Sequence, residues 1–373
     1  MTSKIFEPFT IGNNATLQHR IVMAPLTRLR ADQNNVQLPM TIDYYSQRAV
    51  EPGTLLISEA CTVSPRAGAA FPHAPGIWND EQIARWKEIV DAVHARGSYM
   101  YCQLVAPGRA GFSDAMRAKG YSALDGVSAI PISGPGKETP RVLSEAEIWG
   151  YVAEFAHAAR CAMKAGFDGV EVHGANGYLI DQFTQDNSNH RTDSWGGTIE
   201  NRNRFGVEVA RAVADAIGPE RTGYRVSPWS KFQDMRMADP VPQFSDLARR
   251  LKVLNLGHLH IIEARVTNSD DVEAPERVDF LLDIWDDHSV VLLAGGFTPD
   301  NARFFLDEVY KDRNVALVFG RWFLSTPDLV YRIRHGIAPN AYHRGSFYTP
   351  MKAEGYTDYP YSKEFLEEYK LTL

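Results

Sequence analysis

The sequence has few of the features that mark secreted, metal-binding or membrane proteins. It contains three cysteines in 373 residues, Cys61, Cys102 and Cys161, and no two of them are spaced as CxxC. A disulfide framework or a structural zinc site is therefore not expected. No basic segment followed by a long apolar run occurs at the start, and no run is long enough to span a membrane. These absences predict a cytoplasmic protein without a membrane partner.

Clusters of positive charge are also missing. The formal net charge is −7, and no stretch is rich in Lys and Arg. Nucleic-acid-binding proteins normally carry a basic patch or stripe, so no nucleic-acid partner is expected. The hydrophobic content of 44% is that of a globular protein with enough apolar material for a core.

Three common catalytic or nucleotide-binding signatures do not occur. The sequence lacks the dinucleotide fingerprint GxGxxG, the Walker phosphate loop and the GxSxG nucleophile elbow. A doubly wound open sheet that binds a dinucleotide is the less favoured fold for this reason.

What the sequence does contain is a regular alternation of short apolar runs and amphipathic helical patterns. The predicted strands cover residues 20–25, 54–59, 98–104, 169–173, 223–227, 258–263, 290–294 and 315–319. The predicted helices cover residues 80–96, 144–164, 199–217, 246–254, 276–285, 299–309 and a segment after Pro327. Such an order predicts an α/β protein, a single (β/α)8 TIM barrel over residues 1–373.

One segment interrupts this alternation. The segment of residues 107–141, which follows the third predicted strand, is long, polar and rich in Gly, Ser and Pro. Loops of this length inside a compact domain are usually functional. We therefore predict an inserted, lid-like segment there.

In a β/α barrel the chemistry lies where the strands end, and the loops after strands seven and eight commonly bind phosphate. Gly295-Gly296 and Gly320-Arg321 follow those two strands. Glycines allow backbone amides to approach an anion, and a guanidinium grips phosphate oxygens in a fork. The alternative, that the glycines only form tight turns, stays open for each pair, but both together favour a cofactor with a phosphate.

Two other chemistries are weighed against a cofactor enzyme. Glu171 and His173 lie two apart on a strand and suggest a metal-assisted aldolase or hydrolase, although no further ligands converge in the sequence. Glu59 and Glu263 would supply the carboxyl pair of a glycosidase, a generic pairing. A non-catalytic barrel that only binds a ligand is a third reading. The preferred prediction is a site without metal.

Four stretches carry a resemblance to a known family. They are GFDGVEVHGANGYLIDQFTQDNSNHRTDSWGGTIENRNRF (166–205), MAPLTRLRA (23–31), FGRWFLSTPDL (319–329) and SFYTPMKAEGYTDYP (346–360). With them the chain resembles, over about residues 6–360, the Old Yellow Enzyme family in its fungal and plant branch. The resemblance implies a barrel that binds FMN, is reduced by NADPH or NADH, and reduces a carbon–carbon double bond conjugated to a carbonyl.

The resemblance also implies which residues contact the flavin. The residues that match family contacts are Pro25, Leu26, Thr27, Ala60, Gln103, His173, Arg225, Gly295, Gly296, Gly320 and Arg321. By this likeness Thr27 hydrogen-bonds the ring edge and Gln103 faces the pyrimidine part. Arg225 is the cation near the negative charge of the reduced ring, where a fixed positive charge is stabilising.

A constellation HxxNxY supplies the implied substrate residues. By the resemblance, His173 and Asn176 bind the carbonyl oxygen, and Tyr178 protonates the α-carbon. A tyrosine with a pKa near 10 remains protonated at neutral pH and can donate. Tyr348 matches an aromatic residue of the substrate pocket.

The sequence departs from the family at one position. Many relatives have Trp two residues after the glutamine, where this chain has Val105, which predicts a wider substrate pocket. One specialised fungal group acts on an indole-alkaloid aldehyde in ergot biosynthesis, and its members with Tyr at the acid position reduce the alkene. A pathway-specific reductase of a bulky enal is therefore the alternative to a general ene-reductase. The oligomeric state is expected to be a monomer or a homodimer.

Overall fold

Eight parallel strands form the centre of the molecule in this computed structural model, which describes residues 3–12, 15–267, 270–271 and 275–370. The barrel strands are β3 (Ile21–Met23), β4 (Leu55–Ile57), β6 (Tyr99–Val105), β9 (Gly169–Gly174), β10 (Thr222–Val226), β11 (His258–Ile262), β14 (Val290–Ala294) and β15 (Val315–Phe319). Each strand pairs in parallel with the next, β15 pairs with β3, and β4 pairs with β6. The sheet is therefore closed, as predicted.

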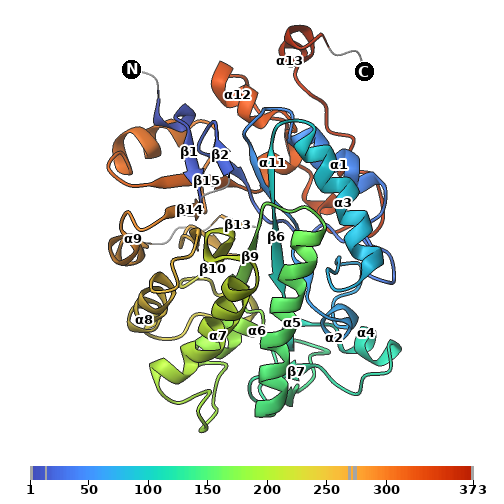
Figure 1. Ribbon diagram of the computed structural model, residues 1–373, viewed down its shortest axis with the longest axis vertical. Coiled ribbons are helices and arrows are strands. Elements are labelled where there is room, and N and C mark those ends of the chain that lie inside the picture. Colours follow the sequence, from blue (N-terminus) through green and yellow to red (C-terminus); the bar gives the residue numbers. More distant parts are fainter. Residues whose placement is uncertain (1–2, 13–14, 268–269, 272–274, 371–373) are drawn as a thin grey trace.

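Helices surround the strands, and Figure 1 shows them on the outside of the molecule. They are α1 (Met40–Arg48), α3 (Asp80–His94), α5 (Glu145–Lys164), α7 (Ile199–Ile217), α8 (Pro240–Lys252), α9 (Asp279–Trp285), α10 (Ala302–Phe304) with the π-turn η5 (Phe305–Val309), and α12 (Leu329–His335). The predicted start of α5 is confirmed, because Ser144 and Glu147 form a reciprocal capping box.

Several helices differ from the sequence-based prediction, most of all α8 and α1. Helix α8 begins at Pro240, six residues earlier than predicted, because proline is favoured in the first turn and follows Asp239 directly. Helix α1 was not predicted at all, because Met40–Arg48 mixes polar and aromatic residues without a clear apolar stripe.

The inserted segment has local structure of its own. It follows β6 and contains the turn η2 (Gly108–Ala110), helix α4 (Ser113–Ala118) and strand β7 (Asp125–Gly126), which pairs with β8 (Arg141–Val142). Arg66 and Arg141 both form ion pairs with the buried carboxylate of Asp125. These contacts connect the insertion to helix α2 (Pro65–Ala69), in the loop after β4.

Smaller elements complete the chain. They are η1 (Lys4–Phe6), β5 (Cys61–Thr62), α6 (Leu179–Thr184), η3 (Pro219–Arg221), η4 (Phe232–Asp234), β12 (Val266–Thr267), β13 (Asp270–Asp271), α11 (Arg321–Ser325), η6 (Arg344–Ser346) and α13 (Lys363–Glu368). No helix of the described part of the chain is long and apolar enough to cross a membrane.

An N-terminal hairpin packs against the barrel interior. Strands β1 (Phe9–Ile11) and β2 (Ala15–Leu17) are antiparallel, and their inward residues join a cluster with the interior of the barrel. Ile11 is fully buried in this cluster, whereas Thr10 on the same strand is exposed. The hairpin therefore adds apolar packing to the barrel.

Replacing Ile11 by Ala should lower the free energy of unfolding by about 2–5 kcal/mol, because the change leaves a cavity among buried side chains. Urea unfolding followed by circular dichroism measures the loss. The matched control, Thr10→Ala on the same strand, should change it by less than about 0.5 kcal/mol. Equal effects of the two changes would show that the hairpin does not pack as described.

Candidate active site

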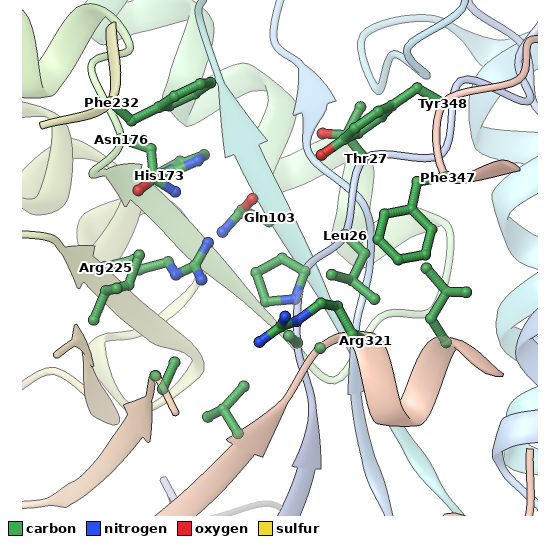
Figure 2. Close-up of a pocket in the computed structure, with 18 of the residues that line it drawn as sticks. Leu26, Thr27, Gln103, His173, Asn176, Arg225, Phe232, Arg321, Phe347 and Tyr348 are labelled. Atoms are coloured by element: carbon green, nitrogen blue, oxygen red, sulfur yellow. The ribbon is translucent and has the colours of Figure 1, made fainter. Parts of the chain in front are cut away.

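A cavity of about 420 Å³ opens at the ends of the barrel strands. This size is in the range of small-molecule and cofactor sites. Most predicted site residues line it: Pro25, Leu26, Thr27, Gln103, His173, Asn176, Tyr178, Arg225, Gly295, Gly296, Gly320, Arg321 and Tyr348. They come from strands and loops far apart in the sequence, and Figure 2 shows Gln103, Arg225 and Arg321 converging on the same space.

Two predicted residues do not belong to this lining. Ala60 lies just before β5 and is 6% exposed, and Val105 at the end of β6 is fully buried. Neither is among the residues that line the cavity. Their assignments to the flavin and the substrate stay predictions.

The aromatic part of the lining was largely missed from the sequence. Phe71, Phe112, Phe232, Phe297, Trp322 and Phe347 all face the cavity. Most of them lie in loops, where no periodic pattern marks a side chain that points inward. Trp322 and Phe347 stood inside stretches quoted for the resemblance, next to the predicted residues Arg321 and Tyr348, and those neighbours were the available signal.

The turn between β9 and α6 presents the HxxNxY residues together. The rings of His173 and Tyr178 are 5.0 Å apart at 61°. Asn176 has a left-handed backbone (φ 57°), and its backbone N–H donates a hydrogen bond to Ser227 Oγ at 2.8 Å. Gly177 is also left-handed, and a Cβ there would lie 2.8 Å from Gln233 Cβ, so only glycine fits between these residues. This tight turn brings three polar side chains to the cavity.

Burial and a neighbouring cation set the charge states in the site. Burial, followed by the Arg225 guanidinium, holds the pKa of His173 well below its usual value, so the imidazole is neutral at neutral pH. Burial lowers the pKa of Arg225 to about 10, which leaves it a cation. Burial and the neighbouring Tyr348 raise the pKa of Tyr178 to about 12, so its hydroxyl stays protonated. The site thus contains a neutral donor, a cation and an acid.

Beneath the cavity lies a buried polar cluster. Glu171 accepts a hydrogen bond from Gln103 Nε2 at 2.8 Å, and its other oxygen contacts His258 Nε2 at 3.0 Å and His260 Nδ1 at 2.8 Å. Its oxygens are therefore engaged, and it does not join His173 in a metal site. Among the described residues, no group of three or more His, Cys, Asp or Glu side chains is arranged to hold a metal ion.

Glu59 and Glu263 also have structural partners. Glu59 accepts hydrogen bonds from the backbone amides of Arg28 and Leu29 and from Gln37 Nε2. It thereby holds the loop that carries Thr27. Glu263 accepts a hydrogen bond from the Tyr310 hydroxyl at 2.8 Å and forms an ion pair with Arg265. Neither carboxylate lines the cavity, so the two do not form the pair of a glycosidase.

The loops after β14 and β15 have the backbone that an anion site needs. Gly295 and Gly296 both have positive φ, 121° and 68°. A Cβ on Gly320 would approach Leu26 Cδ2 to 3.3 Å. Arg321 follows directly, and its Nη1 also donates to the Tyr342 hydroxyl at 3.2 Å. These features fit the predicted phosphate grip.

Unpartnered polar atoms elsewhere in the site also fit a bound cofactor. Within the described structure, Nε of Arg225 and Nδ1 of His173 are buried without a hydrogen-bond partner. Buried polar groups are nearly always paired, so such atoms point to a ligand. The lining contains two arginines and neither Asp nor Glu. The donor set therefore suits a cofactor with a phosphate and a ring that gains negative charge, as FMN does.

Comparisons with known proteins agree with this geometry. A model of the NADH:flavin oxidoreductase / NADH oxidase family matches residues 4–340. The chanoclavine-I aldehyde reductase fgaOx3 of Penicillium roqueforti is 51% identical over 97% of this chain and 98% of its own. A protein of Epichloe festucae var. lolii, named probable inactive reductase easA, is 47% identical over 99% of this chain and 98% of its own.

A solved structure shares the whole fold. Morphinone reductase in complex with tetrahydroNAD superposes with a TM-score of 0.87 at 35% identity, covering 97% of this chain and 98% of the other.

Replacing Arg321 by Ala should weaken FMN retention, because the change removes charge-assisted hydrogen bonds worth about 1.5–3 kcal/mol each. The dissociation constant can be measured by the quenching of flavin fluorescence as apoprotein is added. Arg313→Ala is the control, because Arg313 pairs with Asp283 and does not line the cavity. Unchanged retention in the Arg321 variant would place the phosphate elsewhere.

Proposed function

We propose that this chain, which belongs to the NADH:flavin oxidoreductase / NADH oxidase family, reduces the double bond of a bulky, largely apolar α,β-unsaturated aldehyde. The chain is an FMN-dependent oxidoreductase of the Old Yellow Enzyme type that uses NAD(P)H as reductant. Bound FMN would be held by lining residues such as Gln103, Arg225 and Arg321 and would supply the transfer of a hydride from the nicotinamide to the substrate.

The carbonyl oxygen is assigned to His173 and Asn176. Both line the cavity, and one imidazole nitrogen of His173 has no partner in the described structure. As hydride reaches the β-carbon, negative charge develops on the carbonyl oxygen, and fixed donors stabilise that charge more than the starting carbonyl. The low pKa of His173 means that its imidazole donates in the neutral form.

The proton for the α-carbon is assigned to Tyr178. Its ring lies against His173, next to the carbonyl pair. Its raised pKa keeps the proton on the hydroxyl until a strongly basic carbon develops. His173, Asn176 and Tyr178 are all present, which supports an active enzyme although some relatives are named inactive.

The observation that carries the substrate proposal is a series of aromatic rings leading out of the site. Phe71 lies 6.1 Å from Tyr178 and 6.3 Å from Phe112, between ring centroids. Phe112 and Tyr348 are 51% and 46% exposed, and Phe232 and Tyr348 lie on opposite sides of the cavity in Figure 2. Aromatic walls favour a large, flat apolar molecule. The name of fgaOx3, chanoclavine-I aldehyde reductase, supports an aldehyde as the substrate class.

The remaining assignments are part of the same proposal. Residues 107–141 act as a lid-like insertion in one domain that spans residues 1–373, and Phe112 from this segment supports the role because it lines the cavity. A cytoplasmic location and a monomeric or homodimeric state are the states we expect for an enzyme that acts on small molecules.

Tyr178→Phe should separate the two half-reactions. Flavin reduction by NADPH needs no proton from Tyr178, whereas alkene reduction does. The loss of a general acid typically costs about 10²–10⁴-fold in rate. Stopped-flow absorbance should therefore show parent-like flavin reduction and slowed reoxidation by a cyclic enone.

A nitroalkene is the matched substrate control for this variant. Its nitronate product can leave the site and be protonated in water, so its reduction should slow much less. If the variant reduces cyclic enones at the parent rate, Tyr178 is not the proton donor.

Phe112→Ala should selectively impair bulky substrates. The change removes an aromatic wall at the mouth without touching the flavin contacts. KM should rise for a polycyclic enal and stay near the parent value for 2-cyclohexenone, with unchanged FMN affinity. A uniform rise across substrate sizes would contradict a role of the insertion in substrate selection.

The rate of reoxidation should be nearly constant from about pH 6 to 9. The pKa of His173 is lowered, so its imidazole is neutral over this whole range. The pKa of Tyr178 is raised to about 12, so its hydroxyl is protonated over the same range. Stopped-flow traces with a stable enone in matched ionic strength measure the profile. An inflection that disappears in Tyr178→Phe would contradict the assigned protonation states.

A further inference from the structure

Three buried charged or titratable side chains lie beneath the flavin site and take no part in the proposed reaction. Glu171 on β9 and His258 and His260 on β11 are all fully buried. None lines the cavity, yet Glu171 bonds directly to Gln103, which does. The cluster therefore reaches the cofactor through one amide.

A glycine makes this cluster possible. Strand β10 lies between β9 and β11, with Gly223 opposite both Glu171 and His258. A Cβ on Gly223 would lie 1.9 Å from Cε1 of His258, so the imidazole occupies the space that a side chain would fill. The absence of that side chain lets His258 reach across β10 to Glu171 at 3.0 Å.

Glu171 is ionised in this environment. Burial opposes the charge, but the hydrogen bonds from His260 and His258 hold the pKa of its carboxyl well below the usual value. Burial lowers the pKa of His260 to about 4, so this imidazole is neutral at pH 7. An ionised carboxylate only accepts hydrogen bonds, and here it faces three donor groups. The nearby cation Arg225, which lines the cavity, is therefore balanced by a negative charge below it.

The carboxylate also fixes the orientation of an amide. Because Glu171 can only accept, Nε2 of Gln103 must point toward it at 2.8 Å. The Gln103 oxygen and the second N–H are then available to the cavity. A rotated amide would place two acceptors against each other.

We propose that Glu171 is a positioning residue that orients Gln103 toward the flavin and, through its buried charge, keeps the flavin's reduction potential lower than Arg225 alone would set it. The inference rests on FMN binding and is independent of which enal is reduced. Reduction adds negative charge to the ring, and a fixed negative charge nearby opposes that addition.

The test compares two variants that differ in charge. Glu171→Gln removes the charge at nearly constant volume, and Glu171→Asp keeps it but withdraws the carboxylate from Gln103 by one methylene. The midpoint potential is measured by anaerobic dye-coupled reduction of the purified holoenzyme, without any alkene. FMN affinity is measured on the apoprotein by fluorescence quenching.

Glu171→Gln should shift the potential to a more positive value, speed flavin reduction by NADPH and slow reoxidation. Glu171→Asp should leave the potential near that of the parent and weaken FMN binding about tenfold, because Gln103 loses the charged hydrogen bond that holds its amide toward the flavin. Parent-like FMN affinity in Glu171→Asp would overturn the positioning role. This test does not need the Glu171→Gln variant, so it can be made even if that variant fails to fold. An unchanged or more negative potential in a folded Glu171→Gln holoenzyme would overturn the role of the charge.

Discussion

The pairing of β4 with β6 closes the sheet into a barrel, and the site depends on that closure. Because all eight strands are parallel, their carboxyl ends meet at one rim. Gln103, His173 and Arg225 are neighbours because β6, β9 and β10 are adjacent in the sheet, with His173 opposite Arg225. An open sheet with the same sequence would separate the two strands that carry Thr27 and Gln103.

Much of this rim could be predicted because the informative residues sit at strand ends. A polar residue or a glycine at or near the end of a short apolar run marks both a strand and a site position, as at Gln103, His173 and Gly295. Loop residues carry no such mark. Phe71, Phe112 and Phe232 face the cavity only because of turns far from the strands, and no periodicity reports the direction of a loop side chain. The resemblance to relatives placed Val105 in the substrate pocket; in the structure it is fully buried and is not among the residues that line the cavity, so its role stays a prediction.

Gly223 illustrates a second limit of sequence reasoning. In the sequence it is an ordinary glycine at the start of a predicted strand. Its meaning depends on His258, 35 residues later, whose imidazole fills the space above it. Such a pairing follows from the register of β10 and β11, which hydrophobic patterns do not specify. For the same reason the sequence suggested Glu171 as a possible metal ligand. Only the structure shows that its carboxylate is hydrogen-bonded to three side chains.

Two kinds of structure form the site at the rim: barrel strands with short turns, and longer loops. Strands and short turns hold the groups that we assign to the cofactor, and these positions are fixed by the hydrogen bonding of the barrel. Longer loops after β4, β6 and β10 provide the aromatic walls of the mouth, with Tyr348 from the C-terminal segment. Because loops tolerate change better than barrel strands, the mouth can be adapted to a new enal without moving Gln103 or Arg225. A barrel with a fixed flavin chemistry can therefore serve substrates as different as those that the names of its relatives describe.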